Sequence, residues 1–208
     1  MLLPKLGLDV EEVLSAASTK WNFHRHKPGI GVGGHCIPID PHYYIEIAKR
    51  HGVSSAMSPA ARELNSSMPK YSANEVIRFC EGKPPQKVLV LGFSYKPNVS
   101  DSRETPVMPL MEELIQMGTQ EVLVWDPYAH NITFRREISQ IDDPYGHDGV
   151  DCVIIATAHD QVRELDWEKL SKVVSIPRIF DGRRCLEPSF FQNTDWTYHA
   201  LGRPLGGN

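Results

Sequence analysis

The sequence has 208 residues, of which 41% are hydrophobic, and its formal net charge is −4. That is enough apolar material for one large or two small domains, and the acidic balance excludes a protein that binds nucleic acid or an anionic membrane through bulk charge. No apolar run approaches the roughly 18 residues of a membrane-spanning helix, and four dispersed cysteines favour a reducing, cytoplasmic setting over a disulfide-stapled secreted fold.

The first eighty residues predict helices around one long loop. Asp9 is a good cap for a first helix. Residues 21–41 hold four glycines and three prolines, and a loop of this length is usually functional. Helices are predicted over 42–51 and 58–80, the second of them interrupted or kinked at Pro69.

The pattern changes after a proline-rich linker at 81–86. Buried strands are predicted over 87–92, 121–126 and 150–157, with a fourth at 173–176 or 178–181 and a fifth over 196–201. A helix is predicted over 105–117. Strands that alternate with helices predict an α/β fold with a doubly wound parallel sheet.

Ligands of such sheets bind beyond the carboxyl ends of the strands. The segments expected to surround one crevice there are 93–103, Asp126-Pro127 and 181–184.

The densest chemical signal is the run Gly31-Val32-Gly33-Gly34-His35-Cys36 in the long loop. Closely spaced glycines let a backbone approach a ligand and point N–H groups at it. Cys36 lies just before a predicted helix, whose N-terminal end favours the nucleophilic thiolate, and Asp40 is near enough to orient a water or carry a proton. Cys36 and Asp40 are therefore the candidate catalytic residues.

Two other interpretations of this segment stay open. One is a plain glycine-rich turn with a small buried cysteine. The other is a zinc site, because potential ligands are dense here: His24, His26, His35, Cys36, Asp40 and His42. The usual zinc-ligand spacings are missing, and adjacent residues rarely bind one tetrahedral ion together, so no metal is expected.

Two further segments follow predicted strands. Lys96 and Arg103 offer cations for a phosphate, and Thr105-Pro106 begins a helix whose N-terminus attracts anions. The first segment is not G-x-G-x-x-G, so no dinucleotide fingerprint is predicted. Arg183 or Arg184 could hold a phosphate or a sugar. Taken alone, the first segment could be a solvated charged loop, which is the commoner fate of lysine and arginine, and the second is more typical of a surface turn.

Together these segments resemble the UDP-glucose/GDP-mannose dehydrogenase family. The matching motifs, in order, are Gly31-x-Gly33-Gly34-x-Cys36-x-Pro38-x-Asp40, Gly92-x-x-Tyr95-Lys96 with Asp101-x-Arg103-Glu104-x-Pro106, Asp126-Pro127, and Asp181-Gly182-Arg183. The segment from His35 to Pro41 is most similar to the branch that acts on UDP-N-acetylhexosamines, whereas relatives acting on UDP-glucose often have lysine in place of Ile39. Tyr95 stands where the family usually has phenylalanine.

The resemblance implies an architecture of three parts: an NAD-binding Rossmann domain, a central helical dimerisation domain, and a nucleotide-sugar domain. The chain is then expected to begin inside the central domain and to lack the NAD-binding domain. Residues 1–82 would be the helical, self-associating part, and residues 86–208 a Rossmann-like UDP-sugar-binding domain.

The resemblance also implies a reaction. The hydroxymethyl carbon of a UDP-hexose is oxidised twice with two NAD, Cys36 carries the intermediate as a thioester, and Asp40 assists water or proton transfer. The residues implied to bind the sugar nucleotide are Lys27, Gly29, Gly31, Gly33, Tyr95, Lys96 and Arg183, and those implied to face NAD are Gly34 and Arg103.

Two alternatives from other classes stay open. The chain could be a non-catalytic module that binds UDP-sugars or dimerises, which assays of NAD turnover and of UDP-sugar binding distinguish. It could also be a zinc-dependent hydrolase built on the histidines and Cys36, which metal analysis decides.

Overall fold

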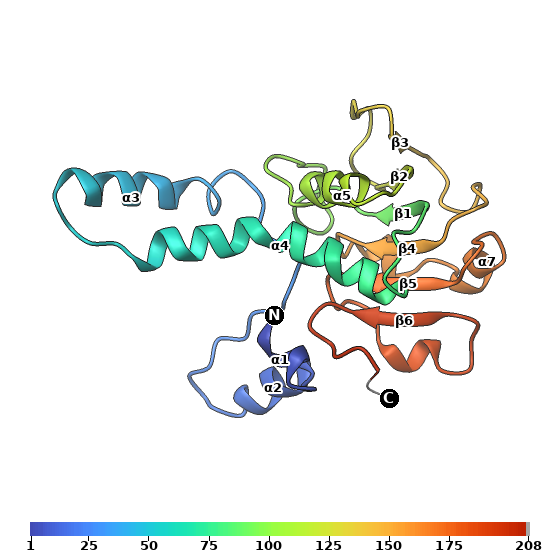
Figure 1. The fold of residues 1–208 in the computed structure, drawn as a ribbon, viewed down its shortest axis with the longest axis horizontal. Coiled ribbons are helices and arrows are strands. Elements are labelled where there is room, and N and C mark those ends of the chain that lie inside the picture. The colour runs from blue at the N-terminus through green and yellow to red at the C-terminus, as the bar shows by residue number, and fades with distance from the viewer. Residues whose placement is uncertain (207–208) are drawn as a thin grey trace.

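The first part of the protein is helical in the computed structural model, which describes residues 1–206. Its helices are α1 (Leu2–Lys5), α2 (Val10–Ala17), α3 (Asp40–Arg50) and α4 (Met57–Phe79). Asp9 caps α2 by accepting a hydrogen bond of 2.8 Å from the N–H of Glu11. Figure 1 shows α3 and the first half of α4 side by side, extending away from the rest of the protein.

Helix α4 continues unbroken through Pro69, so the predicted interruption is wrong, while the alternative, a kink at Pro69, stays a prediction. A proline inside a helix removes one backbone hydrogen bond. Pro69 is buried, and α4 packs along α5 (Val107–Gln116). The helix therefore draws stability from tertiary packing, which outweighs the local loss.

The second part is a six-stranded sheet in which every neighbouring pair is parallel, in the order β3-β2-β1-β4-β5-β6. The strands are β1 (Lys87–Leu91), β2 (Glu121–Trp125), β3 (Ile138–Gln140), β4 (Cys152–Ile155), β5 (Arg178–Asp181) and β6 (Thr197–Ala200). The connections contain α5, α6 (Asp160–Arg163), α7 (Trp167–Ser171) and the 3₁₀ helix η1 (Pro188–Phe191). The expected class, a helical part followed by a doubly wound parallel sheet, is confirmed.

Both faces of the sheet are buried. Val88 and Val90 of β1 belong to one core cluster, together with residues of α5 and with Ala73 and Val76 from the second half of α4. Leu89 belongs to the opposite cluster, which includes residues of α6 and α7. Because β1 is covered on both sides, its sequence is a continuous apolar run and does not alternate.

Two strands, β3 and β5, remain to be compared with the predictions. The short edge strand β3 was not predicted. Of the two candidates for a later strand, residues 178–181 form β5, where Ile179 and Phe180 are fully buried between β4 and β6. None of the helices within residues 1–206 is both long and apolar enough to cross a membrane.

Candidate functional site

The glycine-rich loop lies directly against the segment 93–106 that follows β1. A Cβ added at Gly33 would lie 2.6 Å from the carbonyl oxygen of Glu104 and 2.8 Å from the Cβ of Tyr95. Gly34 has a φ of +90° and donates its N–H to the carbonyl of Arg103 at 3.0 Å. Only glycines permit this approach, which holds the loop before Cys36 in place.

The N–H groups of this loop are partly used by the protein itself. That of Val32 donates to Oδ1 of Asn65 on α4 at 3.0 Å, and that of Gly34 is taken by Arg103. The sequence suggested that such groups would point at a ligand. In the structure these two fasten the loop, so the glycines serve close packing first.

Cys36 is the exposed cysteine of the chain, whereas Cys80 and Cys152 are buried. Its Sγ lies 2.8 Å from Nδ1 of His35. Its carbonyl accepts the N–H of Asp40 at 2.8 Å, which makes a tight turn into α3. The thiol therefore lies just before a helix, as predicted. An adjacent imidazole is in place to exchange its proton, a role the sequence did not assign to His35.

Arg183 connects three segments that are distant in sequence. Its Nε donates to the carbonyl of Ala156 at 2.7 Å, Nη1 to that of Gly31 at 3.5 Å, and Nη2 to that of Tyr95 at 3.4 Å. A Cβ at Gly29 would lie 2.7 Å from Nη1, so a larger residue there would displace the end of the Arg183 side chain. Burial lowers the pKa of this guanidinium. Of its five N–H donors two remain, so Arg183 holds the site together and can still donate to a ligand.

The two cations of the segment 93–106, Arg103 and Lys96, differ in their ion pairs. Arg103 is exposed and pairs with Asp101 through Nη2–Oδ2 at 2.6 Å. Hydrogen bonds from the Arg103 side chain and backbone hold the pKa of Asp101 at about 2. Lys96 is exposed, with Nζ 5.5 Å from the centre of the Tyr95 ring. No carboxylate within residues 1–206 forms a salt bridge with it, so its charge is free for an anion.

Asp126 does not line the expected crevice. Its side chain is fully buried at the end of β2. Its Oδ2 accepts from the N–H groups of Phe93 and Ser94, the hydroxyl of Ser94 and Nε2 of His159, and its Oδ1 from the N–H groups of Tyr128 and Ala129. Burial raises the pKa of Asp126, but these hydrogen bonds outweigh it and hold the pKa well below its usual value. A carboxylate so fully engaged has no role as a ligand.

The structure thus brings several of the predicted residues together. Gly29, Gly31, Gly33 and Gly34 meet Tyr95, Arg103 and Arg183 through the contacts above. Lys27 and Asp40 are exposed, and their side chains make no hydrogen bond or ion pair in the described part of the chain. Asn65 and His159 were missed. Asn65 carried no signal, whereas His159 follows a strand end, where polar residues often serve a site.

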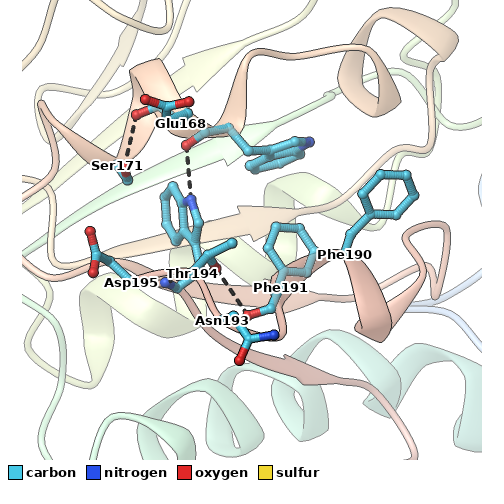
Figure 2. Close-up of a pocket in the computed structure, with 9 residues that line it drawn as sticks. Glu168, Ser171, Phe190, Phe191, Asn193, Thr194 and Asp195 are labelled. Atoms are coloured by element: carbon cyan, nitrogen blue, oxygen red, sulfur yellow. Dashed lines mark hydrogen bonds between the residues drawn. The ribbon is translucent and has the colours of Figure 1, made fainter.

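The protein has one cavity beside this region and a larger one elsewhere. A cavity of about 170 Å³ borders it, lined by Val32 and Pro38, by Asn65 on α4, and by residues 104–106. A larger one of about 360 Å³ lies between α7, η1 and the start of β6. Figure 2 shows its Phe190 and Phe191 with polar Asn193 and Asp195. It contains no predicted site residue. Within residues 1–206 no three potential metal ligands lie close enough together to hold a metal ion.

Comparison with known proteins matches the two parts separately. Residues 1–67 match the central domain of the UDP-glucose/GDP-mannose dehydrogenase family, and residues 89–188 its UDP binding domain. The chain is 30% identical over 191 residues to the UDP-N-acetyl-D-mannosamine dehydrogenase of Pyrococcus horikoshii, covering 90% of this chain and 43% of that protein. It is 32% identical to the UDP-N-acetyl-D-glucosamine 6-dehydrogenase of Pseudomonas aeruginosa, covering 83% and 42%.

Solved structures agree with this. A UDP-glucose dehydrogenase from Pyrobaculum islandicum superposes with a TM-score of 0.79 at 28% identity, over 97% of this chain and 45% of that one. The chain therefore spans less than half the length of these relatives. The resemblance stated from the motifs is confirmed: this chain belongs to the UDP-glucose/GDP-mannose dehydrogenase family, with sequence from its central and UDP-binding domains.

Proposed function

We propose that this chain provides the nucleotide-sugar half of a UDP-sugar 6-dehydrogenase. The observation that carries the proposal is the meeting of Gly29–Gly34, Tyr95 and Arg183 beside the exposed thiol of Cys36. This arrangement offers backbone, cation and nucleophile to one substrate. The chain's two proposed units are residues 1–82 and 86–208, and the second half of α4 packs in the core of the sheet.

In this proposal, substrate binding and the steps at Cys36 are assigned to different residues of this chain. Lys96 binds the diphosphate, while the loop from Lys27 to Gly33 and Arg183 hold the sugar. After the alcohol has become an aldehyde, Cys36 adds to its carbon as a thiohemiacetal, and a second oxidation leaves a thioester. Asp40 assists the water that releases the acid and frees the thiol. His35 takes the thiol proton at Nδ1 when Cys36 attacks.

The residues proposed to face NAD are Gly34 and Arg103. The Arg103 side chain fits this role, since it is 62% exposed and Asp101 orients it without covering it. Gly34 fits less well, because it is buried and its N–H is bound to the carbonyl of Arg103. NAD, when bound, would accept a hydride in each of the two oxidations. We propose that its binding domain is supplied by sequence outside these 208 residues, as the coverage of the relatives suggests.

We further propose a UDP-N-acetylhexosamine as the substrate and a reducing, cytoplasmic setting. The names of the two curated relatives and the segment from His35 to Pro41 support the substrate. The fold is shared by enzymes of different substrates, because a UDP-glucose dehydrogenase superposes with a TM-score of 0.79. All four cysteines are free, which supports the setting.

Titration with UDP tests the nucleotide site without NAD. We expect calorimetry of the chain to show binding, and Lys96→Ala to weaken it roughly tenfold, as expected for the loss of one charge-assisted hydrogen bond. Lys49→Ala, which removes another exposed lysine from α3, should leave the affinity unchanged. No heat and no thermal stabilisation from millimolar UDP would count against the site.

Self-association through the helical part is proposed from its exposed apolar surface. α3, α4 and the adjoining turns leave large side chains uncovered: Ile37, Tyr43, Tyr44, Ile47, Val53 and Met57. A surface patch of this kind usually marks an interface. A second copy of the chain is the occupant implied by the family resemblance.

Sedimentation velocity tests this surface. We expect a dimer for the chain at micromolar concentration, and a monomer for the double variant Tyr43→Asp with Ile47→Asp, because two buried carboxylates would face an apolar partner. Phe190→Asp changes an equally exposed aromatic residue on η1 and should leave the dimer intact. A monomeric wild-type chain would refute the proposal.

A further inference from the structure

His159 lies just beyond β4, fully buried, and both of its ring nitrogens are engaged. Nε2 lies 3.1 Å from Oδ2 of Asp126, and Nδ1 lies 2.9 Å from the backbone nitrogen of Asn98. A backbone N–H only donates, so Nδ1 accepts and carries no proton. The ring is therefore neutral, and its one N–H points at the buried carboxylate of Asp126.

Asn98 is fixed to the segment after β4 at three points. Besides the bond from its N–H to His159, its Oδ1 accepts from the N–H of Asp160 at 3.0 Å, and its Nδ2 donates to the Asp160 carboxylate at 2.7 Å. Its φ of +61° is a left-handed conformation that asparagine tolerates better than most residues. The chain therefore turns sharply at Asn98, two residues after Lys96.

Lys96 lies between this anchor and a separate one. On the other side the carbonyl of Ser94 accepts from Oγ1 of Thr157 at 2.6 Å, and the N–H of Tyr95 donates to the carbonyl of Asp101 at 3.0 Å. The Lys96 side chain itself is exposed and makes no ion pair with the described residues. The backbone that carries Lys96 is thus held on both sides, and loss of the hydrogen bond between Asn98 and His159 would loosen one of the two sides.

We propose that His159 is a positioning residue that, through Asn98, directs Lys96 toward the nucleotide. The buried Asp126 carboxylate orients the imidazole so that its unprotonated Nδ1 faces Asn98. The proposal rests on the proposed role of Lys96 in binding the diphosphate, but its structural step, the anchoring of Asn98 by His159, stands apart from that role.

Two substitutions of His159 each keep only one of the two hydrogen bonds that its imidazole makes. In His159→Asn the amide oxygen occupies nearly the place of Nδ1 and can still accept from Asn98. In His159→Gln the amide nitrogen reaches nearly the place of Nε2 and can still donate to Asp126, while Asn98 loses its acceptor. Both variants are expected to lose stability. Only His159→Gln should weaken UDP binding, by about five- to tenfold, against less than twofold for His159→Asn.

A double-mutant cycle of Lys96 and His159, together with hydrogen exchange of the Asn98 amide, completes the test. Lys96→Ala should cost roughly tenfold in UDP affinity in the wild type and less than about threefold in His159→Gln, since the lysine is already misdirected there. An equal cost in both backgrounds would overturn the proposal. If the wild type does not bind UDP, the proposed function fails instead, and exchange of the Asn98 amide decides the structural step. That amide should exchange faster in His159→Gln but not in His159→Asn, and unchanged exchange in both would refute the anchor.

Discussion

Replacing Cys36 with serine is expected to lower acid formation by on the order of 10³-fold or more in a protein that also supplies the NAD-binding domain. A serine hydroxyl is a poorer nucleophile at neutral pH, and it cannot form the thioester from which the acid is released. Because Cys36 is exposed, the change should not disturb the core. The measurement is acid release together with NADH formation, which should be two per sugar for the wild type.

Thiol labelling of the chain by itself checks the same residue independently of turnover. Limited iodoacetamide should modify Cys36 before Cys80 and Cys152, since those two are buried, and a UDP-sugar should slow the reaction by covering the loop.

In the turnover assay the control is Cys80→Ala, which removes a thiol from the core at the end of α4 and should keep the catalytic rate. Normal acid release by Cys36→Ser would exclude the covalent mechanism and leave the family assignment standing.

Replacing Asp126 with asparagine is expected to lower the free energy of unfolding by about 3–5 kcal/mol, because it disturbs a buried carboxylate that serves many donors. Oδ2 accepts four hydrogen bonds and Oδ1 accepts two. Either orientation of the new amide would turn an NH₂ group toward at least two backbone N–H donors. Urea unfolding should report the loss as a lower midpoint.

The pH dependence of stability gives a second measure of Asp126. Its pKa is lower in the folded protein than in the unfolded chain, where an aspartate titrates near about 4. Its contribution is therefore complete above that value and is lost as the pH falls toward the folded pKa. We expect the wild type to lose stability below about pH 4, and Asp126→Asn to show a shallower decline there.

A capping aspartate supplies the control for this prediction. Asp166 at the start of α7 accepts a single hydrogen bond, from the N–H of Lys169 at 2.9 Å, and lies at the surface. Asparagine caps helices about as well, so Asp166→Asn should stay within roughly 0.5 kcal/mol of the wild type. A value for Asp126→Asn inside the same margin would show that the buried network is not essential for the fold.

The sequence by itself determined where most elements lie and what they are. The strands β1, β2 and β4 and the helices α3, α4 and α5 begin and end within two residues of the predicted positions. This is so because a continuous apolar run or a helical period is local information, as are prolines and glycines at element ends. The motif around Cys36 could also be recognised from the sequence, because its residues are neighbours in the chain.

Only the tertiary structure decided what each of these residues touches. Arg183 and Gly31 are 152 positions apart, and no local pattern indicates that the guanidinium reaches the carbonyl of that loop. The same holds for Asp126, which looked like a residue of an open crevice and proved to be the centre of a buried network with His159. β3 is three residues long, too short to show a period, and it forms because β2 offers it a free edge. Pairings between distant segments depend on which strands become neighbours, and that order follows from burying both faces of one sheet at once.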